Sequence, residues 1–226
     1  VKVVAPNKLV CGPRQNIDRL IGCETQEIAM DASRNRIDQA LIVKNSSVYG
    51  GSGGTIPVIT TSTPNSTMIH EYLHTLGLCD EYKYAEREAV YYCAAGGPNL
   101  ALINPDSSGY TSDQQARSRH MNQIPWNDLI FAQTKITTVP YLGTGTVNHD
   151  MYSSSNNSDR PNNIVSVIGL YRAHVCDNAI PIKYSWQPGR EATIMEFLDA
   201  GLGGANEQIV AKILASRGVR RKLVVA

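Results

Sequence analysis

The segment His70–Asp80, with the sequence HEYLHTLGLCD, constrains the fold of this chain more than any other. Two histidines four residues apart project from the same face of a helix, so both imidazoles can reach a single Zn²⁺. Glu71 follows the first histidine, where a carboxylate can act on a water beside the metal. The segment therefore predicts a helix that carries a hydrolytic zinc site. Apolar residues at helical spacing predict its buried face, namely Ile69, Tyr72, Leu73 and Leu76.

The flanking residues predict where this helix begins and ends. Thr63 is expected to cap its N-terminus, and Pro64 suits the first helical position. Gly77 can adopt the left-handed conformation that turns the chain after a helix. Asp80 then offers a carboxylate oxygen as the third ligand, whereas Glu81 would have to reverse its direction to reach the same point. Three protein ligands leave a fourth position for water, which distinguishes a catalytic zinc from a structural one.

An ordinary amphipathic helix is the alternative, because an HExxH pattern alone also occurs in helices whose histidines are exposed or hydrogen-bonded. The helix stop at Gly77, the acidic residue soon after it, and the lack of another dense His/Cys cluster in the sequence favour the metal site. The other histidines, which stand in polar, turn-rich stretches where an exposed imidazole is expected, are His120, His149 and His174.

Several motifs resemble one family. HExxHxxGxxD resembles the zinc signature of the metzincins with aspartate as third ligand, and its continuation 80–82 (DEY) resembles the IgA-peptidase-like metalloproteases. Residues 45–54 (NSSVYGGSGG) resemble the stretch before the zinc helix of that family. Residues 169–172 (GLYR) and 186–188 (WQP), ahead of Ile194-Met195, are similar to its closing segment. The resemblance covers roughly residues 30 to 200 and is strongest at the zinc helix.

The resemblance implies a fold and an activity. The fold is α/β and metzincin-like: a twisted mixed sheet, a zinc-binding active-site helix and a loop-rich C-terminal half. Residues 1–226 are expected to form a single catalytic domain, with an upper part of about 1–77 and a lower part of about 78–226. The activity is that of a zinc metalloendopeptidase on protein or peptide substrates. One catalytic Zn²⁺ would be bound by His70, His74 and Asp80, and Glu71 would serve as general base towards the zinc-activated water.

Metzincins also place a methionine turn beneath the zinc. Met195 is the best candidate, because small and apolar residues precede it, while Met121 and Met151 are alternatives. A methionine that only fills the core is the simpler interpretation of any one of them. No second donor to the oxyanion can be identified from the sequence, and the side chains that we would examine are Tyr82 and Tyr152.

The remaining elements follow from local patterns. A helix is expected at 24–32 and an amphipathic helix at 206–216, whereas the apolar run 40–43 predicts a central strand. The glycine-rich residues 50–54 are not followed by a helix and lack the lysine and serine of a phosphate-binding loop, so they predict a flexible connection. Residues 56–60 then predict an edge strand, which in the metzincins pairs with extended substrate.

The long polar region after Tyr82 predicts functional loops. Within it, Asp106, Ser108 and Asp113 suggest calcium, but the alternating ligand pattern that ends in glutamate is missing, so a solvated turn is favoured. Trp126 is expected in the core rather than at a substrate platform.

Composition narrows the class of partner. The net charge of the 226 residues is +1, and no basic run has interleaved aromatic residues, so nucleic acid is not an expected partner. No segment approaches the ~20 apolar residues of a membrane span. Residues 1–6 are too short and too interrupted for a signal peptide, so an exported protein would already have lost its signal.

Five cysteines in a chain rich in Ser, Thr, Asn and Gly favour an oxidising compartment, extracellular or periplasmic, although buried thiols in a cytosolic protein remain an alternative. The connectivity does not follow from the sequence. Our hypothesis pairs Cys11 with Cys23 and Cys79 with Cys93, which leaves Cys176 unpaired.

Two other functions are compatible with the same motif. One is a secreted zinc-containing binding or adhesion module without turnover, and the other is a hydrolase of a non-peptide amide. The intact Glu71 argues against the binding module, which has no chemical need for it. Substrate specificity and oligomeric state are left open.

Overall fold

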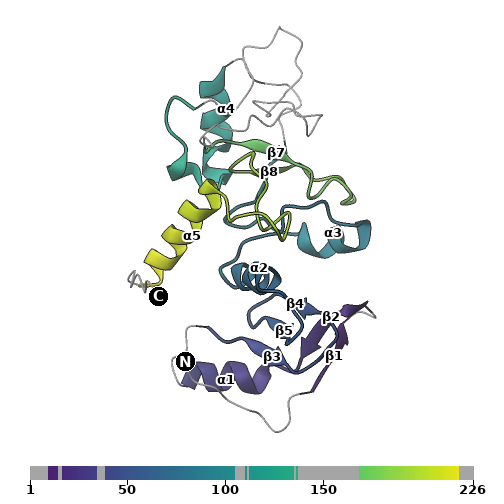
Figure 1. The fold of residues 1–226 in the computed structure, drawn as a ribbon. Coiled ribbons are helices and arrows are strands. Elements are labelled where there is room, and N and C mark those ends of the chain that lie inside the picture. Colours follow the sequence, from purple (N-terminus) through teal and green to yellow (C-terminus); the bar gives the residue numbers. More distant parts are fainter. Residues whose placement is uncertain are drawn as a thin grey trace. The chain divides into compact units, whose positions relative to one another are not determined.

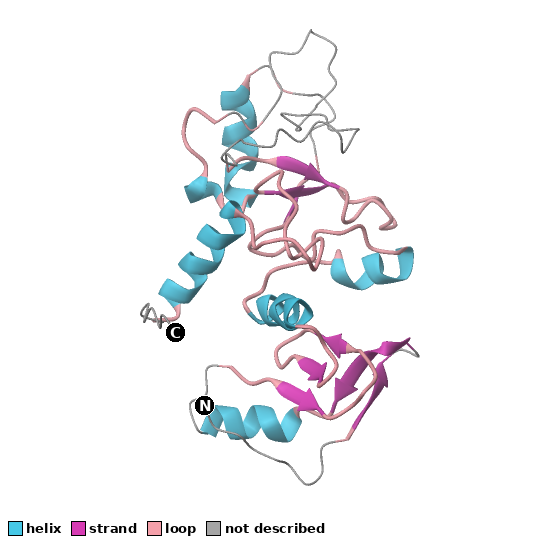
Figure 2. Cartoon of the chain, viewed as in Figure 1, coloured by secondary structure: helices cyan, strands magenta, loops and turns pink. Residues whose placement is uncertain are grey.

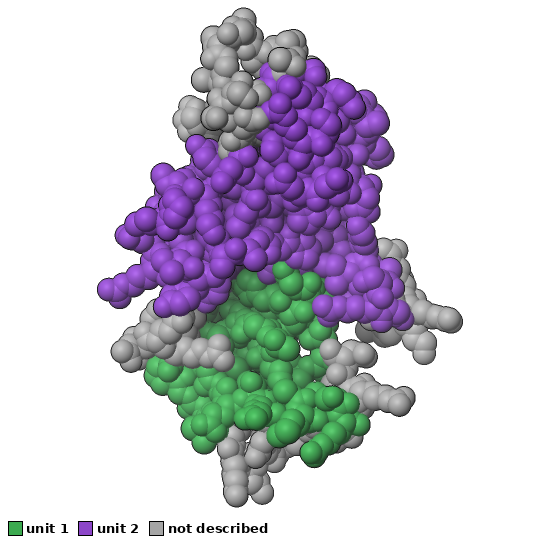
Figure 3. All heavy atoms as spheres, turned by 180° about the vertical axis from the view of Figure 1, so that it is seen from behind, with its two compact units in different colours: residues 1–77 green, residues 78–226 purple. Residues whose placement is uncertain are grey.

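The computed structural model in Figure 1 describes residues 10–14, 17–34, 39–104, 110, 112–134, 136 and 168–218. The chain forms two compact units, Val1–Gly77 and Leu78–Ala226 (Figure 3), which are treated separately below. Both contain helices and strands (Figure 2), so the chain belongs to the mixed α/β class. The boundary falls where the sequence separates an upper from a lower part. That the two parts form one catalytic domain stays a prediction.

Unit 1 is built on a five-stranded mixed sheet with the order β1-β2-β4-β5-β3. The strands are β1 (Cys11–Arg14), β2 (Ile17–Cys23), β3 (Ile42–Lys44), β4 (Gly51–Ser52) and β5 (Val58–Thr60). β4 runs parallel to β2 and antiparallel to β5, and β3 runs parallel to β5. The disulfide between Cys11 and Cys23 joins residues that lie opposite each other on the antiparallel pair β1 and β2. This pairing confirms one half of the disulfide hypothesis.

The strand order reverses two predictions. The apolar run that predicts a central strand forms β3 at the edge of the sheet, where Ile42 is buried but Val43 is 56% exposed. The predicted edge strand forms β5 instead, which lies between β4 and β3 and buries Val58 completely. The reason is that part of the glycine-rich segment pairs with β5 as β4 and occupies the place beside it. Pairing of β5 with an extended substrate therefore has no support here.

Two helices complete the described part of unit 1, α1 (Gln26–Arg34) and α2 (Asn65–Thr75). The start of α2 differs from the prediction, because Pro64 takes the N-cap position. The hydroxyl of Thr63 donates to the carbonyl of Gly50 over 2.6 Å and accepts from the backbone N–H of Thr60 over 2.9 Å. Thr63 therefore links the sheet to the start of α2 rather than capping the helix.

The buried face of α2 also differs from the prediction. Leu73 and Leu76 are buried as expected, but Ile69 and Tyr72 are exposed. The buried residues Thr67, His70, Leu73 and Leu76 are spaced three apart and form one row. A prediction from hydrophobic residues alone therefore gave the wrong buried face, because two of the buried residues are a threonine and a histidine.

Unit 2 contains a small antiparallel sheet with the order β6-β8-β7, formed by β6 (Ala101–Leu102), β7 (Tyr171–Ala173) and β8 (Ser185–Gln187). Two buried tryptophans anchor its core: the indole N–H of Trp126 donates to Gly169 over 2.7 Å, and that of Trp186 donates to Ile103 over 2.8 Å. Trp126 is thus a core residue, as the sequence predicts. The helices are α3 (Glu86–Tyr92), α4 (Asp113–His120), α5 (Gly204–Ser216) and the 3₁₀ turns η1 (Met121–Gln123) and η2 (Asn127–Leu129).

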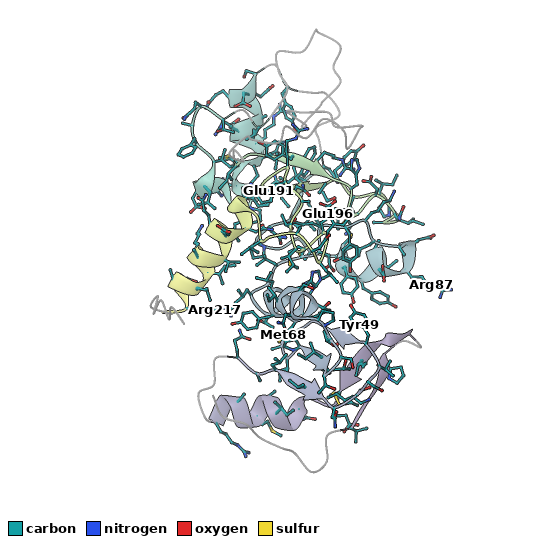
Figure 4. All side chains as sticks on the ribbon, in the orientation of Figure 1. Tyr49, Met68, Arg87, Glu191, Glu196 and Arg217 are labelled. Carbon is teal, nitrogen blue, oxygen red and sulfur yellow. A yellow bond between two sulfur atoms is a disulfide. The ribbon has the colours of Figure 1, made fainter. Side chains whose placement is uncertain are left out.

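The last helix, α5, matches the amphipathic segment that the sequence indicates. Ile209 is buried and Ile213 packs partly against the same core. Glu191, labelled in Figure 4, accepts a hydrogen bond from the backbone N–H of Gly204 over 2.5 Å at the start of the helix. A carboxylate at this position stabilises the N-terminal end of a helix.

The second disulfide contradicts the hypothesis. Cys93 pairs with Cys176, and Cys79 is a free thiol. Cys93 follows α3 and Cys176 lies in the turn after β7, and both are completely or almost completely buried in one apolar cluster. Their separation of 83 residues is why spacing in the sequence favoured the wrong partner.

Candidate metal centre

Helix α2 brings two imidazoles together. The Nε2 atoms of His70 and His74 are 3.2 Å apart, and the rings meet edge to face with centroids 4.8 Å apart. Two nitrogens that bind one tetrahedral zinc at about 2.0–2.1 Å lie about 3.3 Å from each other. The spacing of the two imidazole nitrogens therefore suits a shared ion.

The chain after α2 returns to this pair within a few residues. Gly77 has a φ of 92°, the left-handed conformation predicted for it, and its N–H donates to the carbonyl of His74 over 2.9 Å. Asp80 follows six residues after His74 and is buried. Among the described residues, His70, His74 and Asp80 form a group whose donor atoms all lie within 4.8 Å of one another. This group could hold a metal ion and is called the metal-competent group below. Its members are the three residues predicted as ligands.

Tyr84 orients the carboxylate of Asp80. Its phenol donates to Oδ2 of Asp80 over 2.9 Å, and the contact is buried. Burial, followed by the negative charge of Asp80, raises the pKa of Tyr84 well above its ordinary value, so the phenol keeps its proton and remains a donor. Partners of this kind fix the orientation of metal-binding carboxylates. Tyr84 is not predicted from the sequence, where its only signal is its place soon after the ligand motif.

Glu81 has a different environment from its neighbour. Its Oε1 accepts from the amides of Asn99 over 2.7 Å and Asn206 over 2.9 Å, and its Oε2 accepts from the hydroxyl of Thr193 over 2.5 Å. Burial raises the pKa of Glu81, while hydrogen bonds from Asn206, Thr193 and Asn99 lower it and the charge of Asp80 raises it further. The carboxylate of Glu81 thus accepts hydrogen bonds from three side chains elsewhere in unit 2. It is not a member of the metal-competent group.

Asn99 holds the segment before Asp80. Its side-chain oxygen accepts from the N–H of Cys79 over 2.7 Å, and its amide donates to the carbonyl of the same residue over 2.9 Å. Asn99 is completely buried. Asn99 lies in the long polar region after Tyr82, where no local signal in the sequence distinguishes it from other asparagines.

Met195 lies in a tight turn beside the same segment. It is completely buried, and its carbonyl accepts from the N–H of Glu81 over 2.9 Å. The turn is closed by the N–H of Glu196, which donates to the carbonyl of Thr193 over 2.9 Å. Met195 thus lies in a buried turn, and its role as the methionine turn beneath a zinc stays a prediction. Met121 belongs to η1 and packs against the Trp126 core.

Several other candidates fall outside the described part of the chain. These are Met151, Tyr152, His149, Asp106 and Ser108. Tyr82 is exposed and meets Tyr84 edge to face with a centroid distance of 5.5 Å, so a role as oxyanion donor stays a prediction.

The two other described histidines lie apart from the metal-competent group. His120 is buried rather than exposed, because Tyr110 and Gln123 supply hydrogen-bond partners for its ring nitrogens. His174 is exposed as expected and pairs with Asp177 over 2.7 Å. Asp113, one of the three residues that suggest calcium in the sequence, forms an ion pair with Arg117 over 2.8 Å.

The glycine-rich stretch before α2 lies against the helix. Tyr49, labelled in Figure 4, has its hydroxyl 3.4 Å from that of Thr67. A Cβ atom built on Gly51 would lie 3.8 Å from Cγ of Glu71, and one built on Gly53 would lie 2.8 Å from Oε2 of Glu71 and 2.7 Å from Cδ2 of His74. The stretch that resembles the family segment upstream of the zinc helix therefore lies close to the predicted base and the second predicted ligand.

No model of a known protein family matches the chain, and no curated protein matches it. Among the described residues, none of the helices has the length and apolar character needed to cross a membrane. The motifs and the geometry of the site therefore carry the functional argument.

Proposed function

We propose that this protein is a zinc-dependent metallopeptidase that hydrolyses peptide bonds. The observation that carries the proposal is the 3.2 Å separation of the His70 and His74 Nε2 atoms, with Asp80 in the same group. The resemblance of HExxHxxGxxD and the following Glu-Tyr to the metzincin and IgA-peptidase-like signatures supports it independently.

The donor set suits zinc. Two imidazole nitrogens and one carboxylate oxygen are ligands that Zn²⁺ accepts, and three protein ligands are typical of catalytic rather than structural zinc sites. Tyr84 donates to Oδ2 of Asp80, and a carboxylate has a second oxygen that could serve as the ligand atom. When bound, zinc would polarise the scissile carbonyl and make a water more acidic.

The chain's own residues would move the protons. Glu71 stands next to His70 on α2, and its carboxylate would accept a proton from the attacking water. The same carboxylate would then deliver that proton to the amine that leaves. A metal-binding module without turnover has no need for this group, which is why hydrolysis is the better proposal.

The compartment is part of the proposal. The two disulfides, Cys11–Cys23 and Cys93–Cys176, are consistent with an extracellular location. We place the enzyme outside the cytosol, acting on protein or peptide substrates.

The test combines metal analysis with a cleavage assay. The purified chain should contain about one zinc per molecule, as structural precedent for such sites indicates. It should cleave members of a diverse peptide library, lose this activity after treatment with a chelator and regain it when zinc is added. Zinc binding without cleavage of any peptide would contradict the peptidase and favour a binding module or an amide hydrolase. Absence of zinc binding would contradict the whole proposal.

A further inference from the structure

Gly53, which follows strand β4 directly, lies unusually close to helix α2. A Cβ atom added to Gly53 would lie 2.7 Å from Cδ2 of His74, 2.8 Å from Oε2 of Glu71 and 3.1 Å from Cβ of His74. Carbon atoms without a bond between them do not approach this closely, because attraction turns to repulsion well beyond 3 Å. Glycine is therefore the one residue that fits this position without movement of the neighbouring side chains.

The neighbouring glycines serve other purposes. Gly54 has a φ of 112°, and no atom lies within 4 Å of an added Cβ, so its role is conformational. A Cβ atom added to Gly51 would lie 3.1 Å from the carbonyl oxygen of Val58 and 3.8 Å from Cγ of Glu71. Gly53 is not among the glycines with positive φ, so alanine can adopt its backbone conformation. The cost of a methyl group at Gly53 is thus steric and local.

The backbone at Gly53 cannot easily move aside. The preceding strand β4 is hydrogen-bonded between β2 and β5, and the hydroxyl of Ser52 donates to the carbonyl of Ile21 over 2.6 Å. The hydroxyl of Thr63 holds the other side of the segment through the carbonyl of Gly50. A methyl group at Gly53 would therefore displace the Glu71 carboxylate and the His74 ring rather than the strand.

We propose that Gly53 is a positioning residue of the active site, whose bare backbone sets where the Glu71 carboxylate and the His74 imidazole lie. This rests on the proposed function and adds to it a residue outside the HExxH motif. Gly53 touches neither the metal nor the reacting atoms and acts through Glu71 and His74. A displacement of about 1 Å in such a group can lower the rate by about 10²-fold.

The experiment compares Gly53→Ala with Gly12→Ala, a control in the same unit where an added Cβ meets no atom within 4 Å. Both variants are also made in a Glu71→Asp background, because the shorter side chain withdraws the carboxylate from the added methyl group. The measurements are kcat and KM for a cleaved peptide, the visible spectrum of the Co²⁺-substituted protein, and urea unfolding of the metal-free protein.

The expected result is a fall in kcat of about 10²-fold for Gly53→Ala, with a smaller change in KM and an altered Co²⁺ spectrum. Gly12→Ala should match the parent in all three. In the Glu71→Asp background, Gly53→Ala should cost less activity and less stability than it does in the parent.

Two results would overturn the inference: a Gly53→Ala protein with the parent's kcat and Co²⁺ spectrum, or an equal effect of Gly12→Ala. An unchanged cost of Gly53→Ala in the Glu71→Asp background would overturn the part of the inference that concerns Glu71. The comparison of unfolding free energies in the two backgrounds needs neither metal nor turnover. It therefore tests the contact between the added methyl group and Glu71 even for a variant of reduced stability. A parent protein that binds no metal would instead sink the proposed function, while the comparison of unfolding free energies still tests the contact.

Discussion

At the scale of single residues, the metal-competent group was predictable because its geometry is local. His70 and His74 are one helical turn apart, and Gly77 turns the chain towards Asp80 within three residues. Tyr84 was not predictable in the same way, since its contact with Asp80 depends on how the following segment is buried. The sequence therefore indicates residues that could bind a metal better than it indicates the residues that orient them.

Tyr84 provides a prediction at this scale. Tyr84→Phe removes the hydroxyl that donates to Asp80 but keeps the ring, so zinc affinity should fall by about 10–100-fold, as is typical for lost partners of metal ligands. Competition with a chromophoric chelator measures this affinity. Tyr91→Phe is the control, because Tyr91 is 68% exposed. Equal affinities for the two variants would show that Tyr84 has no influence on the site.

Among the elements, the helices α1, α2 and α5 followed from local pattern, but the strand order did not, and α3 and α4 formed in the region after Tyr82 that was predicted as loops. The expected helices near 24–32 and 206–216 appear as α1 and α5. The places of β3 and β5 were exchanged, because an apolar run of three or four residues looks alike in an edge strand and in a central one. The order depends on β4, whose two residues, Gly51 and Ser52, carry almost no strand signal.

Glu81 joins several elements of unit 2. Its carboxylate connects Asn99, the turn at Thr193 and Asn206 at the start of α5. Glu81→Ala would leave these donors without their acceptor in a buried place. The free energy of unfolding of the metal-free protein should therefore fall by at least about 2 kcal/mol, since each unsatisfied buried group costs about 1–3 kcal/mol.

Urea unfolding of the metal-free protein measures this effect without interference from bound zinc. Glu86→Ala is the control, because Glu86 is exposed on α3 and its loss should change stability by no more than about 0.5 kcal/mol. A Glu81→Ala protein as stable as the control would refute a structural role for this network.

At the scale of the whole molecule, long-range pairing separates what the sequence predicts from what it does not. The Cys11–Cys23 disulfide spans 12 residues and was predicted, whereas Cys93–Cys176 spans 83 and was not. The packing of the folded core decides which cysteines lie close enough to form a disulfide. The distance between two cysteines in the folded chain cannot be inferred from their separation in the sequence. The α/β class, by contrast, is what the family resemblance implies, and the local helix and strand patterns along the chain agree with it.

The disulfide pattern is itself a prediction for the intact protein. A digest without reductant should yield one peptide pair linked through Cys93 and Cys176 and another through Cys11 and Cys23. Thiol titration of the denatured, unreduced protein should find one thiol per chain, that of Cys79. Mass spectrometry that detects Cys79 linked to Cys93 would contradict this connectivity.

In the proposed enzyme, the HExxH helix carries a zinc site in which Glu71 serves the water and not the metal. Zinc content and peptide cleavage should be measured together on the parent and on Glu71→Gln. We expect about one zinc per chain in both proteins and a loss of cleavage of about 10²–10⁴-fold or more in the variant, since the amide cannot accept the proton. Loss of a general base should lower the rate at least about 10²-fold, so a Glu71→Gln protein that cleaves peptides within about threefold of the parent rate would rule out this role for Glu71.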